Sequence, residues 1–308
     1  MTNRVVITGM GGVSSIGMSV PEIYNSMKEG KSGIGMLDIP DLARLKVKNG
    51  GQIKNFDANN HFEQKKIARM DRFSQFALLA ADEAITSSGL INSQETWSEN
   101  AGIILGSSIG GIETINNSYK QVFEEGHNRL HPLTIPKIMN NSATSLISIE
   151  YRIQGPSFTV SSACSSANHA MGLAYETIKS RKSNIMITGG SESFLSFGGI
   201  KPWESLRVLS HDKCRPFSKG RDGLVHGEGA GIFVFESLDS AKKRKAEIVA
   251  EIIGFSMSSD ASDLIQPNNI GPEKALEGVL KDGMINKTDV AYINAHGTGT
   301  ILNDKMES

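Results

Sequence analysis

Cys164 is the residue of this sequence best placed to act as a nucleophile. It stands in GPSFTVSSACSSANHAMGLAYETIKS, between a short β-branched stretch and a run with helical spacing. A chain that turns here presents the cysteine at a helix N-terminus, where unpaired amides and the helix dipole favour thiolate over thiol. Small neighbours leave the sulfur open to a bulky substrate, and the amide of Cys164 could donate to an oxyanion. An inert buried thiol is the alternative.

His296 is the second residue with a setting for catalysis. It follows the apolar stretch VAYINA directly, in AHGTGT, where glycines let the backbone turn and threonine hydroxyls can donate or accept. A histidine at the carboxyl end of a parallel strand faces the side of an α/β sheet where ligands usually bind. A structural histidine is the alternative. We expect His169 to pack or hydrogen-bond locally and Cys214 to be structural.

The pentapeptide GSSIG at residues 106–110 indicates a different chemistry, that of serine hydrolases. It matches the GxSxG elbow and follows a predicted strand, which would make Ser108 the nucleophile and His296 its base. The GxSxG pattern fixes only three of five positions, so it recurs easily by chance in a chain with 32 glycines. No acid stands out as the third member of a triad. Ser108 is therefore an alternative to Cys164.

Two glycine-rich stretches approach nucleotide-binding motifs and fail on spacing. GMGGVSSIG would need glycine at position 14, which is Ser14, and the GKS at 30–32 would need glycine at position 25, which is Asn25. No His/Cys cluster has zinc spacing, and two cysteines cannot form a disulfide framework. We expect no metal and no resident cofactor.

The charge balance gives no reason to expect nucleic acid or an anionic membrane as a partner. The formal net charge is -1, from 32 Lys+Arg against 33 Asp+Glu. No apolar run approaches the ~18–20 residues that span a bilayer, and the N-terminus lacks the apolar run of a secretory signal. We expect a soluble, cytoplasmic protein.

Strands and helices that alternate along the chain must position these residues. Strands separated by helices predict a mainly parallel sheet covered on both sides, so the class is α/β. One clear helix spans residues 71–89, where Asp71 can cap. Its buried face should hold Phe73, Phe76, Ala77, Ala80 and Ala84. The predicted strands are 4–8, 102–105, 157–160, 184–188, 231–235, 247–253 and 290–295.

The last part of the chain predicts one long helix and the start of another. A helix should begin at Pro272, bury Leu276, Val279 and Leu280, and end at Gly283. After the HGTGT turn, ILNDKMES is typical of a first helical turn capped by Asn303 or Asp304. A single turn cannot sustain itself, because nucleation is costly. We therefore expect the sequence to be cut off inside a structural unit.

Together these stretches resemble the β-ketoacyl–acyl-carrier-protein synthases, particularly the elongating type of fatty-acid synthesis. The resemblance runs from residue 3 to the last residue, and the order and spacing of its motifs are highly specific. It rests on RVVITGMGGVSSIG, KSGIG, ARMDRFSQFALLAADEA, GSSIGG, IQGPSFTVSSACSSANHA, MITGGSES, CRPFSKGRDGLVHGEGAGIFVFE and VAYINAHGTGTILNDKMES.

The resemblance implies a thiolase-like fold, in which two similar α/β halves pack as five layers, α-β-α-β-α. Residues 1–250 would form the N-terminal half with the nucleophile. Residues 251–308 would begin a C-terminal half that is incomplete. A homodimer is implied, and acyl carrier protein is the implied partner, whose own phosphopantetheine arm makes a further cofactor unnecessary.

The resemblance also implies roles for individual residues. Cys164 would accept an acyl group as a thioester, and malonyl-carrier would then decarboxylate and attack it. His296 would donate a hydrogen bond to the malonyl thioester carbonyl and stabilise the enolate. Thr298 and Thr300 would contact the pantetheine arm, and Ile109 would gate the acyl pocket.

Two departures from the family pattern limit what the resemblance implies. HPLTIP stands where many relatives have SPFFVP, so Leu133 and Thr134 replace two aromatic residues and acyl preference cannot be carried over. The family's last part, with a second histidine, a lysine and a glycine-rich phenylalanine loop, is absent. A non-catalytic partner subunit of a ketosynthase is therefore a further alternative, although such subunits typically lack the cysteine that is present here.

Overall fold

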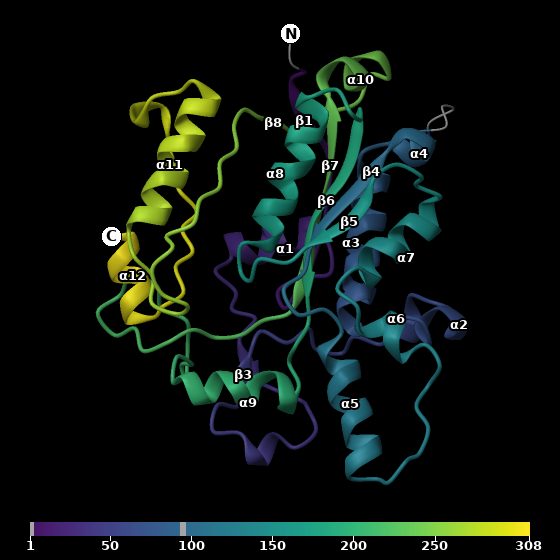
Figure 1. Ribbon diagram of the computed structural model, residues 1–308, viewed down its shortest axis with the longest axis vertical. Helices are drawn as coiled ribbons and strands as arrows, with labels where there is room; N and C mark the ends of the chain where they lie inside the picture. The colour runs from purple at the N-terminus through teal and green to yellow at the C-terminus, as the bar shows by residue number, and fades with distance from the viewer. Residues whose placement is uncertain (1–2, 93–96) are drawn as a thin grey trace.

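The computed structural model describes residues 3–92 and 97–308, and its centre is a six-stranded sheet with the order β5-β4-β6-β7-β1-β8 (Figure 1). A separate two-stranded ribbon pairs β2 with β3. The strands are β1 (Val5–Ser14), β2 (Gly35–Met36), β3 (Asn49–Gly50), β4 (Gly102–Gly106), β5 (Ser157–Val160), β6 (Ile185–Glu192), β7 (Gly229–Ser237) and β8 (Ala250–Ile252).

The sheet is mixed, so the expectation of a mainly parallel sheet was wrong. β4 runs parallel to β5 and β6, whereas β7 is antiparallel to β6 and to β1, and β8 is antiparallel to β1. Parallel neighbours need a crossover, which helices supply between β4, β5 and β6. The connection from β6 to β7 holds a helix (Phe197–Leu206) as well as irregular segments, and the other neighbours lie far apart in the chain, so alternation along the sequence does not fix their direction.

Alternate side chains of the sheet divide between two hydrophobic layers. In β4, Ile103 and Leu105 join the core cluster beneath α3 (Arg72–Ser87), while Ile104 between them joins the cluster beneath α8 (Ser166–Lys179). α3 and α7 (Ser142–Tyr151) therefore cover one face, and α8 covers the other (Figure 1).

Helix α3 confirms the analysis of residues 71–89. Asp71 is its N-cap and accepts a hydrogen bond from the backbone N–H of Phe73 at 3.4 Å. All five residues expected on its inner face are fully buried. The helix passes so close to β1 that a Cβ on Gly11 would lie 1.9 Å from the carbonyl oxygen of Ala80. Glycine in GMGG thus permits helix–sheet packing.

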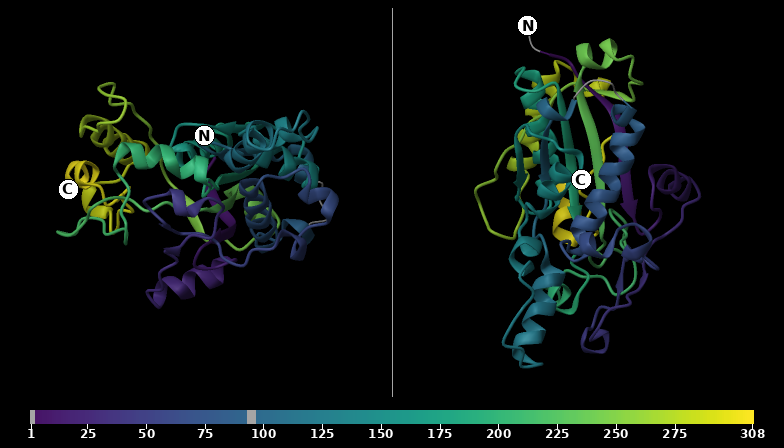
Figure 2. Two further views of the ribbon diagram at one scale, coloured as in Figure 1. Left: turned by 90° about the horizontal axis from the view of Figure 1, so that it is seen from below. Right: turned by 90° about the vertical axis from the view of Figure 1, so that its right-hand side faces the viewer.

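The chain after β8 contributes helices at one side of the molecule. α11 (Ile270–Gly283) and α12 (Ile301–Glu307), drawn in yellow, lie beyond α8, and Figure 2 shows them at the far left when the molecule is seen from below. The strand predicted at 290–295 is wrong, because these residues are irregular and mostly exposed. A strand requires a neighbour for its backbone hydrogen bonds, and the described residues supply none here. Leu276 is 50% exposed rather than buried.

The last helix also differs from expectation. Thr300 is the N-cap of α12, so Asn303 and Asp304 lie inside a helix of seven residues. Asp304 is only 1% exposed and bonds to other segments. Tertiary contacts of this kind stabilise a helix that would be marginal alone.

The remaining helices complete the two layers and the lower end of the sheet. None of the helices within residues 3–92 and 97–308 has the length and hydropathy needed to cross a membrane. The other α-helices are α1 (Val20–Lys28), α2 (Gln64–Ile67), α4 (Trp97–Asn100), α5 (Ile112–Phe123), α6 (Thr134–Ile138), α9 (Phe197–Leu206) and α10 (Leu238–Lys243), and short 3₁₀ turns cover Leu42–Arg44, Ala58–Asn60, Leu90–Asn92 and Lys287–Asp289.

Candidate active site

Cys164 lies on the turn between β5 and α8, where the sequence predicts it. Ala163 before it has φ 50°, a left-handed conformation that is uncommon for a residue with a side chain. Helix α8 has Ser165 as its N-cap and begins at Ser166. The thiol is exposed. The turn therefore presents the sulfur in front of the first turn of α8, where free amides stabilise a thiolate.

Side chains from the start of α8 hold this turn in place. The Ser166 hydroxyl accepts the backbone N–H of Ser162 at 2.9 Å and donates to the Ala163 carbonyl at 2.6 Å. The Ser165 hydroxyl donates to the Ser162 carbonyl at 2.7 Å. Ser162 Oγ and His169 Nδ1 are 2.8 Å apart, which is the local hydrogen bond expected for this histidine. These bonds fix the strained backbone beside the nucleophile.

Two glycines let the sheet approach the first turn of α8. A Cβ on Gly106 would lie 2.3 Å from the backbone nitrogen of Ala167, and one on Gly190 would lie 2.8 Å from the Ala167 Cβ. Neither distance leaves room for a side chain. The glycines therefore bring the ends of β4 and β6 beneath the nucleophile.

A cavity of about 470 Å³ opens beside the thiol. Its lining includes Cys164, Ser108, Glu192 and Phe194, together with small residues from the ends of the central strands. Ile109, the predicted gate, follows Ser108 and is half-buried. The cavity provides room for a substrate group attached to the sulfur.

Cys164, which lines this cavity, meets His296 from a distant part of the chain. A hydrogen bond with His296 is the main cause that lowers the pKa of the Cys164 thiol, against the opposing effect of burial. The same bond raises the pKa of the His296 imidazole, again against burial. Each shift favours the charged form. The contact between the two groups therefore favours a thiolate beside an imidazolium.

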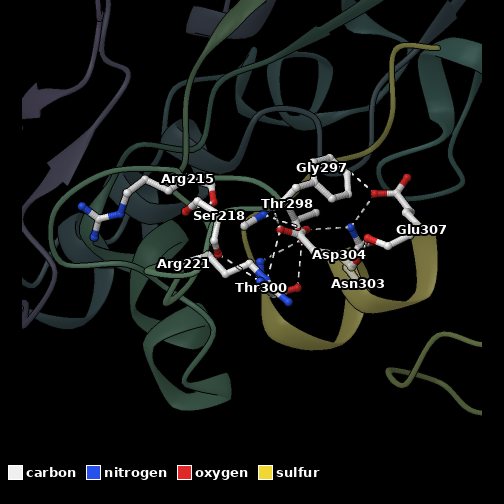
Figure 3. Close-up of polar contacts among 12 residues, drawn as sticks. Arg215, Ser218, Arg221, Gly297, Thr298, Thr300, Asn303, Asp304 and Glu307 are labelled. Atoms are coloured by element: carbon white, nitrogen blue, oxygen red, sulfur yellow. Dashed lines mark hydrogen bonds and ion pairs between the residues drawn. The ribbon is translucent and has the colours of Figure 1, made fainter.

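Two carboxylates of α12 hold the loop that carries His296 (Figure 3). Glu307 accepts the backbone N–H groups of His296 and Gly297, both at 2.7 Å. Asp304 accepts the N–H of Gly299 at 3.1 Å and that of Phe217 at 2.7 Å. The position of His296 therefore depends on α12.

The predicted threonines lie on the same loop. Thr298 Oγ1 and Thr300 Oγ1 are 2.9 Å apart. The Cys214 thiol lies 3.5 Å from the carbonyl oxygen of Thr298, and burial raises its pKa. Cys214 thus lacks the activation found at Cys164.

Glu192, Asp304 and Glu307 are site residues that the sequence analysis did not identify. Asp304 was expected only as a helix cap, and neither glutamate was assigned a role. A usable signal was an acid at the end of a glycine-containing strand, as in GGSE, and acids about one and two helical turns after the HGTGT loop. Carboxylates at such positions are within reach of the free N–H groups of glycine-rich turns.

The geometry does not favour Ser108 as a nucleophile. Its hydroxyl donates to Glu192, which also accepts its backbone N–H at 2.6 Å. His296, the base that a hydrolase would require, is bonded to Cys164. Cys164 is present and its pKa is lowered, so the site does not favour the alternative of a non-catalytic partner subunit either.

Family profiles match nearly the whole chain. The profile described as "Beta-ketoacyl synthase, N-terminal domain" matches residues 2–241, and "Beta-ketoacyl synthase, C-terminal domain" matches residues 249–308. Nodulation protein E of Rhizobium sp. (strain N33) is 42% identical over 308 residues, which cover 100% of this chain and 76% of that protein. The 3-oxoacyl-[acyl-carrier-protein] synthase 2 of Staphylococcus aureus (strain COL) is 37% identical over 311 residues, covering 99% and 75%.

A solved structure confirms the fold class. "The ishigamide ketosynthase/chain length factor" superposes with a TM-score of 0.92 at 30% identity, covering 100% of this chain and 76% of that chain. The fold is therefore thiolase-like α/β, as the resemblance implied.

Proposed function

Because the chain belongs to the beta-ketoacyl synthase family, we propose that it catalyses decarboxylative Claisen condensation of an acyl thioester with a malonyl thioester. The contact of Cys164 with His296 beside a cavity carries this proposal. The name of the staphylococcal relative supports acyl carrier protein as the partner that delivers both groups. Fatty-acid or polyketide-like biosynthesis is the corresponding pathway class.

The first half-reaction transfers the acyl group to Cys164. The thiolate attacks the carbonyl carbon of the acyl thioester, and the amide of Cys164 donates to the resulting oxyanion. The pantetheine sulfur leaves and takes the proton that His296 holds. The products are an acyl–Cys164 thioester and a neutral imidazole.

Acylation also prepares His296 for the second half-reaction. Once the sulfur is esterified, the hydrogen bond and charge that raise the pKa of His296 are gone. The neutral imidazole then donates its remaining N–H to the malonyl thioester carbonyl while carbon dioxide leaves. The carbanion attacks the acyl carbonyl, and the bond to Cys164 breaks to give a β-ketoacyl product two carbons longer. A donor of this kind contributes about 3–4 kcal/mol to the transition state.

Other residues would position the substrates. Thr298 and Thr300 lie on the loop of His296, so their hydroxyls are available to the pantetheine arm. Ile109 lies next to Ser108, a residue of the cavity wall, which is consistent with a gate for the acyl chain. No resident cofactor is required, because the carrier supplies the pantetheine.

We also propose that the protein is cytoplasmic and forms a homodimer. Each chain would consist of an N-terminal and a C-terminal half that divide near residue 250. β5 lies at the edge of the sheet, and its Phe158 is 44% exposed. An edge strand with unpaired backbone groups can pair with a second copy. The balanced net charge supports neither nucleic acid nor an anionic membrane as a partner.

The condensation assay tests the proposal. The protein is mixed with hexanoyl-acyl carrier protein and malonyl-acyl carrier protein. The masses of the carrier-bound products are then measured by mass spectrometry. We expect β-ketoacyl-carrier two carbons longer, and none with Cys164→Ala, while Cys214→Ala keeps the activity. Product formed equally by Cys164→Ala would exclude this function for the thiol.

A further inference from the structure

Glu192 contacts the loop that forms one wall of the Cys164 cavity. It is the last residue of β6 and lines the cavity together with the thiol. Its carboxylate accepts the backbone N–H of Ser108 at 2.6 Å, the Ser108 hydroxyl, and the Ser107 hydroxyl at 3.4 Å. Three donors from two adjacent loop residues therefore converge on one carboxylate.

The carbonyl groups of the same loop are held by other segments. The Asn140 side-chain amide donates to the Ser107 carbonyl at 3.1 Å and to the Ser108 carbonyl at 3.4 Å. The Ser161 hydroxyl donates to the Ser108 carbonyl at 3.2 Å. Ser161 follows β5 on the segment that leads to Cys164. The loop is thus fixed both to β6 and to the segment of the nucleophile.

The carboxylate at this position opposes the activation of the nucleophile. Its negative charge raises the pKa of the Cys164 thiol, against the effect of His296. A hydrogen bond to a charged acceptor is, however, roughly twice as strong as a neutral one. Glu192 therefore holds the cavity wall by strong hydrogen bonds, although its charge disfavours the thiolate form of Cys164.

We infer that Glu192 is a positioning residue that holds Ser108 and thereby sets which acyl chain lengths Cys164 accepts. The inference rests on the proposed function, because it concerns the acyl group transferred to the thiol. Ile109 is joined to Ser108 by a peptide bond, so a displaced Ser108 also moves the predicted gate. The GSSIG serine then has a role in the shape of the acyl site rather than in hydrolysis.

Acylation rates with two chain lengths test this role. Carrier protein charged with butanoyl or hexadecanoyl groups is mixed with each variant, and acylation of Cys164 is followed by mass spectrometry. We expect Glu192→Ala and Ser108→Ala to change the ratio of the two rates by about tenfold, since each loses hydrogen bonds to a charged group. Glu192→Gln should stay closer to the original ratio, because its amide oxygen still accepts the Ser108 N–H.

Two controls separate positioning from general damage. Alkylation of Cys164 by iodoacetamide, which needs no acyl cavity, should not slow in any variant, and loss of the Glu192 charge should speed it, because that charge raises the pKa of the thiol. Glu251→Gln changes a partly exposed carboxylate that pairs with Arg4 and should leave the ratio unaltered. If Glu192→Ala does not fold, Ser108→Ala decides the question.

The outcomes distinguish this inference from the proposed function. An unchanged ratio in both Glu192→Ala and Ser108→Ala, with the unmodified sequence acylated, would overturn the inference alone. No acylation of the unmodified sequence would overturn the proposed function, and the inference with it.

Discussion

The hydrogen bond between Cys164 and His296 predicts how the reactivity of Cys164 depends on pH. Because the hydrogen bond with His296 lowers the pKa of the thiol, His296→Ala should return that pKa toward its ordinary range. The thiolate would then be scarce at neutral pH and abundant only in alkaline solution. Alkylation by iodoacetamide reports the thiolate directly, since the thiol itself is a poor nucleophile.

The size of the effect follows from the attraction between two neighbouring opposite charges. Two unit charges about 4 Å apart attract by about 1 kcal/mol in water and about 4 kcal/mol at an effective dielectric constant near 20. Cys164 and His296 are both exposed, so the lower part of this range applies. A loss of about 1.4 kcal/mol corresponds to a tenfold change in an equilibrium. We therefore expect alkylation at neutral pH to slow about tenfold.

The assay measures the alkylation rate of Cys164 across the pH range in a Cys214→Ala background, which leaves a single reactive thiol. His127→Ala, which removes an exposed histidine beside Glu125, serves as the matched control and should leave the profile unchanged. In His296→Ala the profile should move to higher pH and reach the original rate in alkaline solution. An identical profile with and without the His296 imidazole would refute the ion-pair reasoning.

Three further substitutions test other parts of the account. Glu307→Ala removes the acceptor of the His296 and Gly297 amides, so acylation of Cys164 should fall about tenfold; unchanged acylation would show that α12 does not position the histidine. Gly106→Ala places a methyl group against the first turn of α8 and should lower the free energy of unfolding in urea by about 1–3 kcal/mol; an equally stable variant would contradict the close packing. Burial lowers the pKa of His226 to about 4, so the unfolded state gains a proton first as pH falls below 6.5. The contribution of His226 to the free energy of unfolding should therefore be complete above pH 6.5 and fall by about 3 kcal/mol toward pH 4. Urea unfolding at pH 7 and pH 4 should show that His226→Leu lacks this part of the decline. An equal decline in His226→Leu would contradict the role of His226.

Local patterns predicted the elements whose burial follows a regular period. Phe73, Phe76 and Ala80 recur at helical spacing, and all three are fully buried in α3. Cys164 was predicted because a strand, a turn of small residues and a helix follow one another within one short segment. In both cases the information lies within a few residues.

Such local patterns do not show which distant segments of the chain lie together or in which direction neighbouring strands run. The direction of β7 depends on the long connection that contains α9, and residues 290–295 lack a neighbouring strand among the described residues despite their β-branched composition. Asp304 and Glu307 bond mainly to backbone amides, which any residue supplies, and Glu192 bonds to two serines that lie far from it in the sequence. The meeting of Cys164 with His296 came from the family resemblance rather than from spacing.

The most direct measurement is the mass of the protein after exposure to acyl-carrier thioester without malonyl-carrier. One added acyl group should map to the peptide that contains Cys164, and hydroxylamine should release it as expected of a thioester. A folded protein that stays unmodified, or that carries the acyl group on another residue, would contradict the assignment of Cys164 as the acyl acceptor.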